Sequence, residues 1–388
     1  CVVLATSGCG GPPATAPQAT TKTSGTEAGS ADKPTPATPA DNAAAKSETK
    51  PGDSNASLAP ETPDSDPKAS RTRLKSLKVE LKELAAITMV DQAARQLVFS
   101  PDGSRLALAS LSPTKLWNVP ALDGETKFEE FSESVAFMPE GDALLTSGKQ
   151  LTNRSQLLDL KTGKARKEFE HGIEFPRTTI VTPDGKTALY SEGNSGTNIR
   201  IWDLESGKQK RVLKTKPQFW VSVMAVSPDS RWLAYPDNED AAIAIYDLTT
   251  GEEHWRYEAP AGIGGHFQIV AIQWFGDKGQ IALLAGDGPY HQANVVNKTV
   301  DTQFLGLSDD EPWCFALSND GRLAAYGVNG KIQLWDAWTG KKIHEVSAHP
   351  RQTERLAFSP DNTLLASINA DDEVQLKLWK IEPINEEP

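Results

Sequence analysis

Cysteine is scarce in this chain: there are three in 388 residues, at positions 1, 9 and 314. Small disulfide-bonded scaffolds carry a dense set of cysteines, so this spacing does not fit a disulfide-bonded protein. Cys314 lies in the apolar run WCFAL, which predicts a buried and unreactive thiol.

The chain also lacks an excess of positive charge. It has 40 Lys and Arg against 52 Asp and Glu, a formal net charge of −12. Residues 1–75 contain eight of each sign, so the whole excess of acid falls on residues 76–388. This balance argues against nucleic acid or an anionic lipid surface as the main partner.

Large apolar residues are almost missing from residues 10–73, where Leu58 is the single example. Such a stretch cannot bury enough surface to offset the entropy of ordering it. We therefore expect residues 10–75 to form a disordered linker with an end-to-end distance on the order of 45 Å. The rest of the chain has no apolar run long enough to span a membrane.

Beyond residue 76 the sequence repeats a turn motif. It reads FSPDG at 99–103, FMPEG at 137–141, VTPDG at 181–185, VSPDS at 226–230, LSNDG at 317–321 and FSPDN at 358–362, with a worn copy, WFGDKG, at 274–279. The third residue of each copy is separated from the next by 38, 44, 45, 48, 43 and 41 residues. A Pro-Asp-Gly sequence is typical of a tight turn between two strands. The period predicts a repeat architecture in which each unit is a small sheet.

A second landmark follows each turn by 16 to 20 residues, at the end of the third predicted strand. Its members are an aromatic residue or an aromatic–Asp pair in five repeats: Trp117, Trp202-Asp203, Tyr246-Asp247, Trp335-Asp336 and Trp379. A glycine-containing turn usually comes next. Aromatic side chains on strands pack well between sheets, so we expect these residues to be structural.

The turn motifs and the Trp-Asp pairs resemble the WD-repeat β-propeller family over about residues 80–381. The resemblance implies an all-β fold, a seven-bladed propeller of four-stranded antiparallel blades, over residues 76–382 with a tail at 383–388. It also implies that a strand near residues 80–88 completes the last blade. Leucines at 74, 77, 81 and 84 have helical spacing, which is the alternative for that segment. The weak fifth repeat, 269–304, leaves six or eight blades as alternatives.

Many blades of that family hold a His–Ser–Asp–Trp network, for which the last repeat alone offers His349, Ser367, Asp372 and Trp379.

Residues 1–9, CVVLATSGC, resemble the end of a bacterial lipoprotein signal peptide, the lipobox. The resemblance implies cleavage before Cys9 and a lipid on its thiol, which would place the protein in the bacterial cell envelope, facing the periplasm or the surface. Thr6 departs from the Leu that is commoner there. The alternatives are Cys1 as the lipidated residue, or a stray cysteine in a cytoplasmic protein.

No catalytic motif emerges from the sequence. His344, Glu345 and His349 resemble a zinc-protease motif, but the histidines are five apart, so they would not share one face of a helix. We therefore predict no catalytic residue, metal or cofactor. Some propellers are hydrolases or quinone-dependent enzymes, so a site at the central channel is the alternative.

The remaining hypothesis is a protein-interaction scaffold that binds protein partners. In the resembled family, one face of the disc carries the loops that lead into each first strand and the loops between second and third strands. These loops would offer aromatic and Arg side chains, the preferred anchors of interfaces: Phe175, Arg177, Phe219, Trp220, His266, Tyr290, Trp313 and Arg351. The alternative for Trp220 and Trp313 is burial between blades.

Overall fold

The computed structural model describes residues 77–89, 94–147, 154–170, 176, 178–192, 198–215, 223–237, 242–258, 269–276, 279–285, 289–305, 312–369 and 373–384. These residues form strands and turns without a helix. None of this described part could therefore cross a membrane as a helix.

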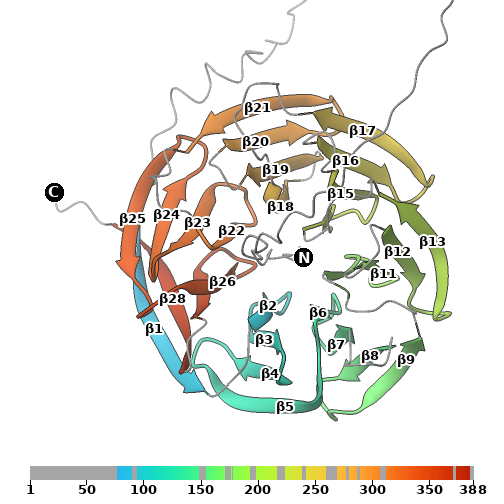
Figure 1. Cartoon of the computed structure of the whole chain (residues 1–388), viewed down its shortest axis with the longest axis horizontal. Helices are drawn as coiled ribbons and strands as arrows, with labels where there is room; N and C mark the ends of the chain where they lie inside the picture. The colour runs from blue at the N-terminus through green and yellow to red at the C-terminus, as the bar shows by residue number, and fades with distance from the viewer. Residues whose placement is uncertain are drawn as a thin grey trace, which may run out of the picture. The chain divides into compact units, whose positions relative to one another are not determined.

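The strands form seven antiparallel sheets of four, arranged as blades around a central axis (Figure 1). Blade 1 contains β2 (Ala94–Phe99), β3 (Arg105–Ser110), β4 (Pro113–Asn118) and β5 (Asp123–Phe131); blade 2 contains β6 (Ser134–Phe137), β7 (Ala143–Ser147), β8 (Arg154–Asp159) and β9 (Ala165–Glu170). Blade 3 contains β10 (Thr179–Val181), β11 (Thr187–Ser191), β12 (Asn198–Asp203) and β13 (Lys208–Lys214); blade 4 contains β14 (Ala225–Val226), β15 (Trp232–Asp237), β16 (Ala242–Asp247) and β17 (Glu252–Glu258).

Blade 5 contains β18 (Ile269–Phe275), β19 (Gln280–Ala285), β20 (Pro289–Asn294) and β21 (Thr299–Phe304); blade 6 contains β22 (Cys314–Leu317), β23 (Leu323–Val328), β24 (Lys331–Asp336) and β25 (Lys341–Ser347). Blade 7 contains β26 (Thr353–Phe358), β27 (Leu364–Asn369), β28 (Val374–Pro383) and β1 (Val79–Met89). The predicted all-β propeller with seven blades is confirmed. The weak fifth repeat forms a complete blade, so the alternatives of six and eight blades were wrong.

The repeated turn motif has a defined hydrogen-bond pattern. Asp102 accepts hydrogen bonds from the Ser100 hydroxyl (2.6 Å) and the Ser104 amide (3.0 Å), while the Ser100 hydroxyl oxygen accepts one from the Arg105 amide (2.9 Å). Gly103 completes the turn at a φ of +72°, a conformation that glycine adopts without a steric penalty. The bond to the aspartate recurs between Thr182 and Asp184, Ser227 and Asp229, Ser318 and Asp320, and Ser359 and Asp361. These bonds set the register of the first two strands in five blades.

The aspartates at the ends of third strands hold the next turn. The carboxylates of Asp203, Asp247 and Asp336 accept hydrogen bonds from amides of the turns that follow, over 2.6, 2.8 and 3.2 Å respectively. The aromatic residues of this landmark are buried: Trp117, Trp202, Tyr246, Trp335 and Trp379. Both landmarks are thus local hydrogen-bonded turns, and they end the first and third strands at equivalent positions in successive blades.

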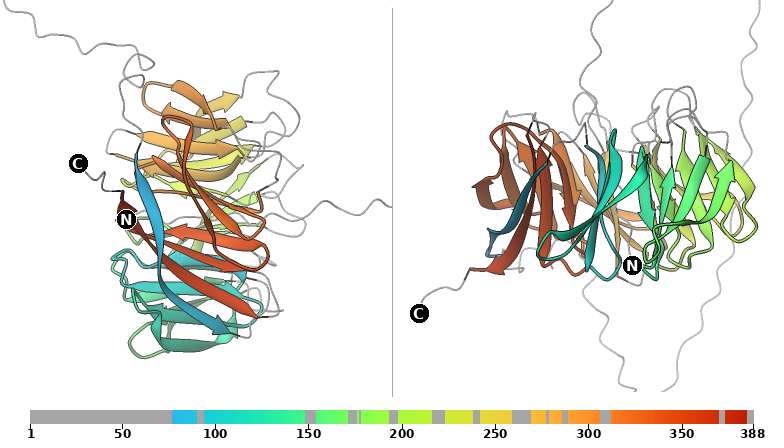
Figure 2. Two further views of the ribbon diagram at one scale, coloured as in Figure 1. Left: turned by 90° about the vertical axis from the view of Figure 1, so that its left-hand side faces the viewer. Right: turned by 90° about the horizontal axis from the view of Figure 1, so that it is seen from below.

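The ring is closed by β1, which pairs antiparallel with β28 and is the outer strand of blade 7 (Figure 2). Leu81 is buried, whereas Leu84 is 45% exposed beside a register shift between Glu83 and Ala85. The helical alternative was therefore wrong for Leu81 and Leu84, because both lie in a strand that pairs with β28, whereas Leu74 lies outside the described residues. The amide of Leu77 also donates a 2.9 Å hydrogen bond to Asp336 of blade 6.

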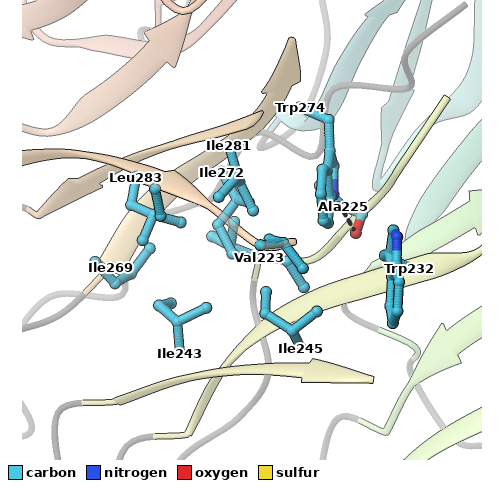
Figure 3. Packing of buried hydrophobic residues seen from close by; sticks show 13 residues of the cluster. Val223, Ala225, Trp232, Ile243, Ile245, Ile269, Ile272, Trp274, Ile281 and Leu283 are labelled. Atoms are coloured by element: carbon cyan, nitrogen blue, oxygen red, sulfur yellow. Dashed lines mark hydrogen bonds between the residues drawn. The ribbon is translucent and has the colours of Figure 1, made fainter. Parts of the chain in front are cut away.

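The core lies between neighbouring blades. Between blades 4 and 5, Trp274 is fully buried among apolar side chains that include Val223, Ile245 and Ile281 (Figure 3). Its indole N–H donates to the carbonyl oxygen of Ala225 over 3.1 Å. This bond satisfies the one polar atom of the side chain and ties the first strands of two blades together.

Candidate functional site

The candidate site lies where the first strands of the blades begin. These strands, β2, β6, β10, β14, β18, β22 and β26, are the innermost strands of their sheets, around the central axis (Figure 1). Because neighbouring strands are antiparallel, the turn between the second and third strands reaches the same face as the start of the first. One face of the disc therefore collects both sets of loops.

Two of the predicted side chains are placed on this face. Trp313 precedes β22, donates its amide to the Gly327 carbonyl (2.9 Å) and leaves 39% of its surface exposed. Arg351 precedes β26 and is exposed. The starts of β22 and β26 approach closely, since a Cβ on Gly327 would collide with Cys314 on one strand and Thr353 on the other.

The loop that carries Arg351 is held firmly. The amides of Ala348 and His349 both donate to the carbonyl of Gly330, at 2.8 Å each. Gly330 has a φ of +77°, and a Cβ there would collide with the carbonyl oxygens of His349 and Arg351. Glycine is therefore required at this turn, which positions Arg351.

Below this loop lies part of the network implied by the family resemblance. Ser367 Oγ lies 2.8 Å from His349 Nε2 and accepts a 2.9 Å hydrogen bond from the indole N–H of Trp379. Burial, with a smaller effect of Lys377, lowers the pKa of His349 to about 4, so its imidazole is neutral at pH 7. Ser367 is fully buried, which makes this histidine–serine pair a support for the loop and not a nucleophilic centre.

Tyr290 does not belong to the predicted face. Tyr290 was expected on an exposed loop between the second and third strands, but β20 begins at Pro289, and Tyr290 is fully buried between blades 5 and 6. Its hydroxyl donates to the carbonyl oxygen of Gly321. That prediction was wrong because the strand starts earlier and turns the phenol into the core.

The other predicted site residues, Cys9, Phe175, Arg177, Phe219, Trp220 and His266, lie outside the described residues, as does Asp372.

Charged residues that were not predicted occupy the position in their blades that Trp313 occupies in blade 6, at the start of the first strand. Arg95, Glu133 and Glu354 each stand six residues before the third residue of a repeated turn motif, as Trp313 does. Arg95 forms a 3.3 Å ion pair with Glu133, which links blades 1 and 2. The repeat register itself was the signal that could have found them. We call Arg95, Glu133, Trp313, Arg351, Glu354 and Arg355 the inner-strand rim.

The rim also joins the last blade to the first. The amide of Ala94 donates to Glu354 Oε2 (3.1 Å), and Arg355 Nε donates to the carbonyl of Arg95 (2.9 Å). Burial raises the pKa of the Glu354 carboxyl above its usual value, against the opposing effects of Arg355, the Ala94 amide and Arg95. The ionised carboxylate therefore costs free energy in the folded state.

This cost predicts that Glu354→Gln stabilises the protein at pH 7. A group whose folded pKa is raised favours the folded state fully below its unfolded pKa and loses that contribution as the pH rises through the folded pKa. Glutamine is neutral throughout and keeps an oxygen for the Ala94 amide. We expect an increase in Tm of about 2 °C at pH 7 that disappears below about pH 4, measured by calorimetry.

Glu133→Gln is the matched control, because it removes the ion pair with Arg95 and should not raise the Tm. An equal Tm increase in both variants would contradict the assignment.

Chemically, the rim offers an exposed indole, an exposed guanidinium and partly buried charges of both signs. Among the described residues, no group of three or more His, Cys, Asp or Glu side chains is arranged to hold a metal ion. This combination suits a protein surface, since Trp and Arg supply large contact areas and directed hydrogen bonds.

Comparisons with known proteins agree with the fold. The chain is 33% identical to cilia- and flagella-associated protein 52 of Chlamydomonas reinhardtii over 85 residues, 20% of this chain and 14% of that protein. It is 34% identical to WD repeat and SOCS box-containing protein 1 of Mus musculus over 68 residues, 17% of this chain and 16% of that protein. It is 38% identical to superkiller complex protein 8 of Dictyostelium discoideum over 82 residues, 21% of this chain and 27% of that protein.

No family model matches the chain. The chain spans between about a seventh and a quarter of the length of these relatives, so the matches bear on the repeats and not on whole proteins. The seven complete blades and the matches to proteins named for their WD repeats together support a WD-repeat β-propeller.

Proposed function

We propose that this protein is a non-catalytic scaffold that binds a protein partner on the face where its first strands begin. The observation that carries the proposal is that Trp313 and Arg351 are both exposed and stand just before β22 and β26, the first strands of neighbouring blades, where backbone hydrogen bonds hold Trp313 and residues 348–349. Propellers with WD repeats generally bind protein partners, and one of the short matches is to a protein named for its WD repeat.

A fixed surface favours binding because little conformational entropy is lost when a partner docks. The Gly330 carbonyl holds the loop before β26, and the Gly327 carbonyl holds the residue before β22. Arg95, Glu133 and Glu354 add charges of both signs at the starts of the first strands of blades 1, 2 and 7. Such a rim favours a partner with an apolar centre and a mixed polar border.

Replacement of the two exposed anchors tests the proposal. Because Trp and Arg dominate binding energies at interfaces, Trp313→Ala combined with Arg351→Ala should weaken partner binding by at least about tenfold. The partner is first captured by crosslinking in cells and then purified, and its affinity for each variant is measured by calorimetry.

The matched control combines Val296→Ala with Lys161→Ala. Val296 is 61% exposed and Lys161 is exposed, and both lie in turns between third and fourth strands, on the opposite face. Unchanged binding by the folded Trp313/Arg351 variant would refute the proposed face. Weakening by the control to the same extent would do so as well.

We also propose that the scaffold is held at the bacterial envelope by a lipid on Cys9. The support is the sequence CVVLATSGC followed by a long polar stretch that suits a tether. Cys9→Ser should move the protein from the membrane fraction to the soluble fraction. An unchanged distribution in the wild-type and variant cells would favour the cytoplasmic alternative.

A further inference from the structure

One outer strand of the propeller differs from the others in charge. The outer strand of each blade lies at the outer edge of the disc, farthest from the central axis (Figure 1). β13 carries Lys208, Lys210, Arg211 and Lys214 without an acidic residue, a net charge of +4. The other outer strands are +1 (β25), 0 (β9), −1 (β1 and β21), −2 (β17) and −3 (β5). The basic strand stands out in a protein whose net charge is −12.

These cations are available to a partner. All four side chains are exposed. Lys210 pairs with Asp203 (2.8 Å), and Arg211 donates to the Tyr246 hydroxyl (3.0 Å). Lys208 and Lys214 form no ion pair with any residue that the structure describes. Two unpaired ammonium groups thus stand near the two ends of the strand.

The backbone of β13 is available as well. The strand pairs with β12 on one side and is the last strand of its sheet. Its other side pairs with no strand in the described part of the chain. The N–H and C=O groups of such an edge are a template for one more strand.

Lysines on exposed edges commonly prevent pairing between copies of a protein, because like charges repel. That role does not account for the concentration on β13, since the other outer strands have equally open edges and net charges of +1 or below. A charge of one sign excludes an edge of the same sign and admits a strand of the opposite sign.

We propose that β13 binds an acidic, extended segment of a partner protein, which adds to blade 3 as a fifth strand. The main-chain ladder supplies affinity without sequence preference, and the lysines select acidic residues. This surface lies on the outer edge of the disc and is separate from the inner-strand rim. An experiment can therefore refute one of the two proposed binding sites and leave the other intact.

The test uses the full chain and synthetic peptides of about nine residues, long enough to cover the strand. The first alternates Glu with Val and Thr. The second has the same sequence with alternate backbone amides N-methylated, which removes ladder donors and keeps the charge. The third has Lys in place of Glu. Binding is measured by fluorescence anisotropy at low salt and at about 0.3 M salt, where surface charges are screened.

We expect the acidic peptide to bind and to protect β13 amides from hydrogen exchange. Because an exposed ion pair contributes up to about 1 kcal/mol, Lys208→Glu with Lys214→Glu should weaken binding roughly tenfold or more. Lys341→Glu with Lys342→Glu on β25 makes the same change in net charge and should leave the affinity within about twofold.

Several results would overturn the proposal. The acidic peptide could show no binding up to about 1 mM, near the weak limit of specific recognition. The N-methylated peptide could bind equally well, or the β25 variant could weaken binding as much as the β13 variant, which would indicate general electrostatics. Binding of anionic vesicles or of a second copy through β13, with the acidic peptide inactive, would assign the strand to another occupant.

Discussion

Deletion of residues 77–89 should leave a chain that does not fold into a closed propeller. This segment forms all of β1, the outer strand of blade 7, and precedes the rest of that blade by more than 260 residues of sequence. Its loss exposes the edge of β28 along ten paired positions. It also removes Leu81 from the core between blades 6 and 7.

The expected loss is large because many interactions disappear together. Each hydrogen bond contributes about 0.5–1.5 kcal/mol and a buried leucine about 1.5–3 kcal/mol. Summed over the strand, the loss is comparable with the whole stability of an ordinary domain, about 5–15 kcal/mol. The exposed edge of β28 should then promote aggregation.

Near-ultraviolet circular dichroism and thermal unfolding would measure this effect. A chain that begins at residue 77 is the control, and its Tm should stay within about 1 °C of that of the full chain. A synthetic peptide of residues 77–89 should restore the signal in trans, and the same peptide with Leu81→Asp should not. A wild-type Tm in the deleted chain would contradict the role of β1 in closure.

Replacement of Trp274 by alanine should destabilise the protein by about 3–5 kcal/mol, the range found when a large buried aromatic is truncated. The side chain is fully buried between blades 4 and 5, and its N–H donates to the Ala225 carbonyl (Figure 3). The substitution leaves a cavity and removes this hydrogen bond between the blades at once. Chemical denaturation should show the change as a lower midpoint.

Trp274→Phe separates these two contributions. It keeps most of the ring volume and removes the hydrogen bond, so we expect a smaller loss of about 1–3 kcal/mol. Equal losses in the two variants would mean that packing contributes little. A loss below about 1 kcal/mol for Trp274→Ala would mean that this interface relaxes around the cavity.

The architecture could be predicted because its signals are local. A Pro-Asp-Gly turn closes through bonds between residues two to five apart, as from Ser100 to Asp102 and Arg105. Such contacts form in the same way wherever the motif occurs, so the period of the turns revealed the blades. The closing strand was also expected, and it was found at Val79–Met89 against the predicted 80–88.

The candidate site could be predicted only in part. Trp313 and Arg351 lie on the face that the sequence indicated, whereas Tyr290 is buried and Glu354 was missed. The position of Tyr290 depends on where β20 begins, which is decided by pairing with β19. The raised pKa of Glu354 depends on burial between residues 260 positions apart, which no local pattern contains.

Trp274 and Trp313 show what the sequence determines and what only the tertiary structure determines. Both belong to, or adjoin, the first strand of a blade, and both are large apolar residues within a strand-like sequence. The sequence was sufficient to place each in a blade, because turns and strand ends are defined by neighbours along the chain. Only the packing of adjacent blades buried Trp274 completely and left Trp313 39% exposed, since exposure depends on side chains that are distant in sequence.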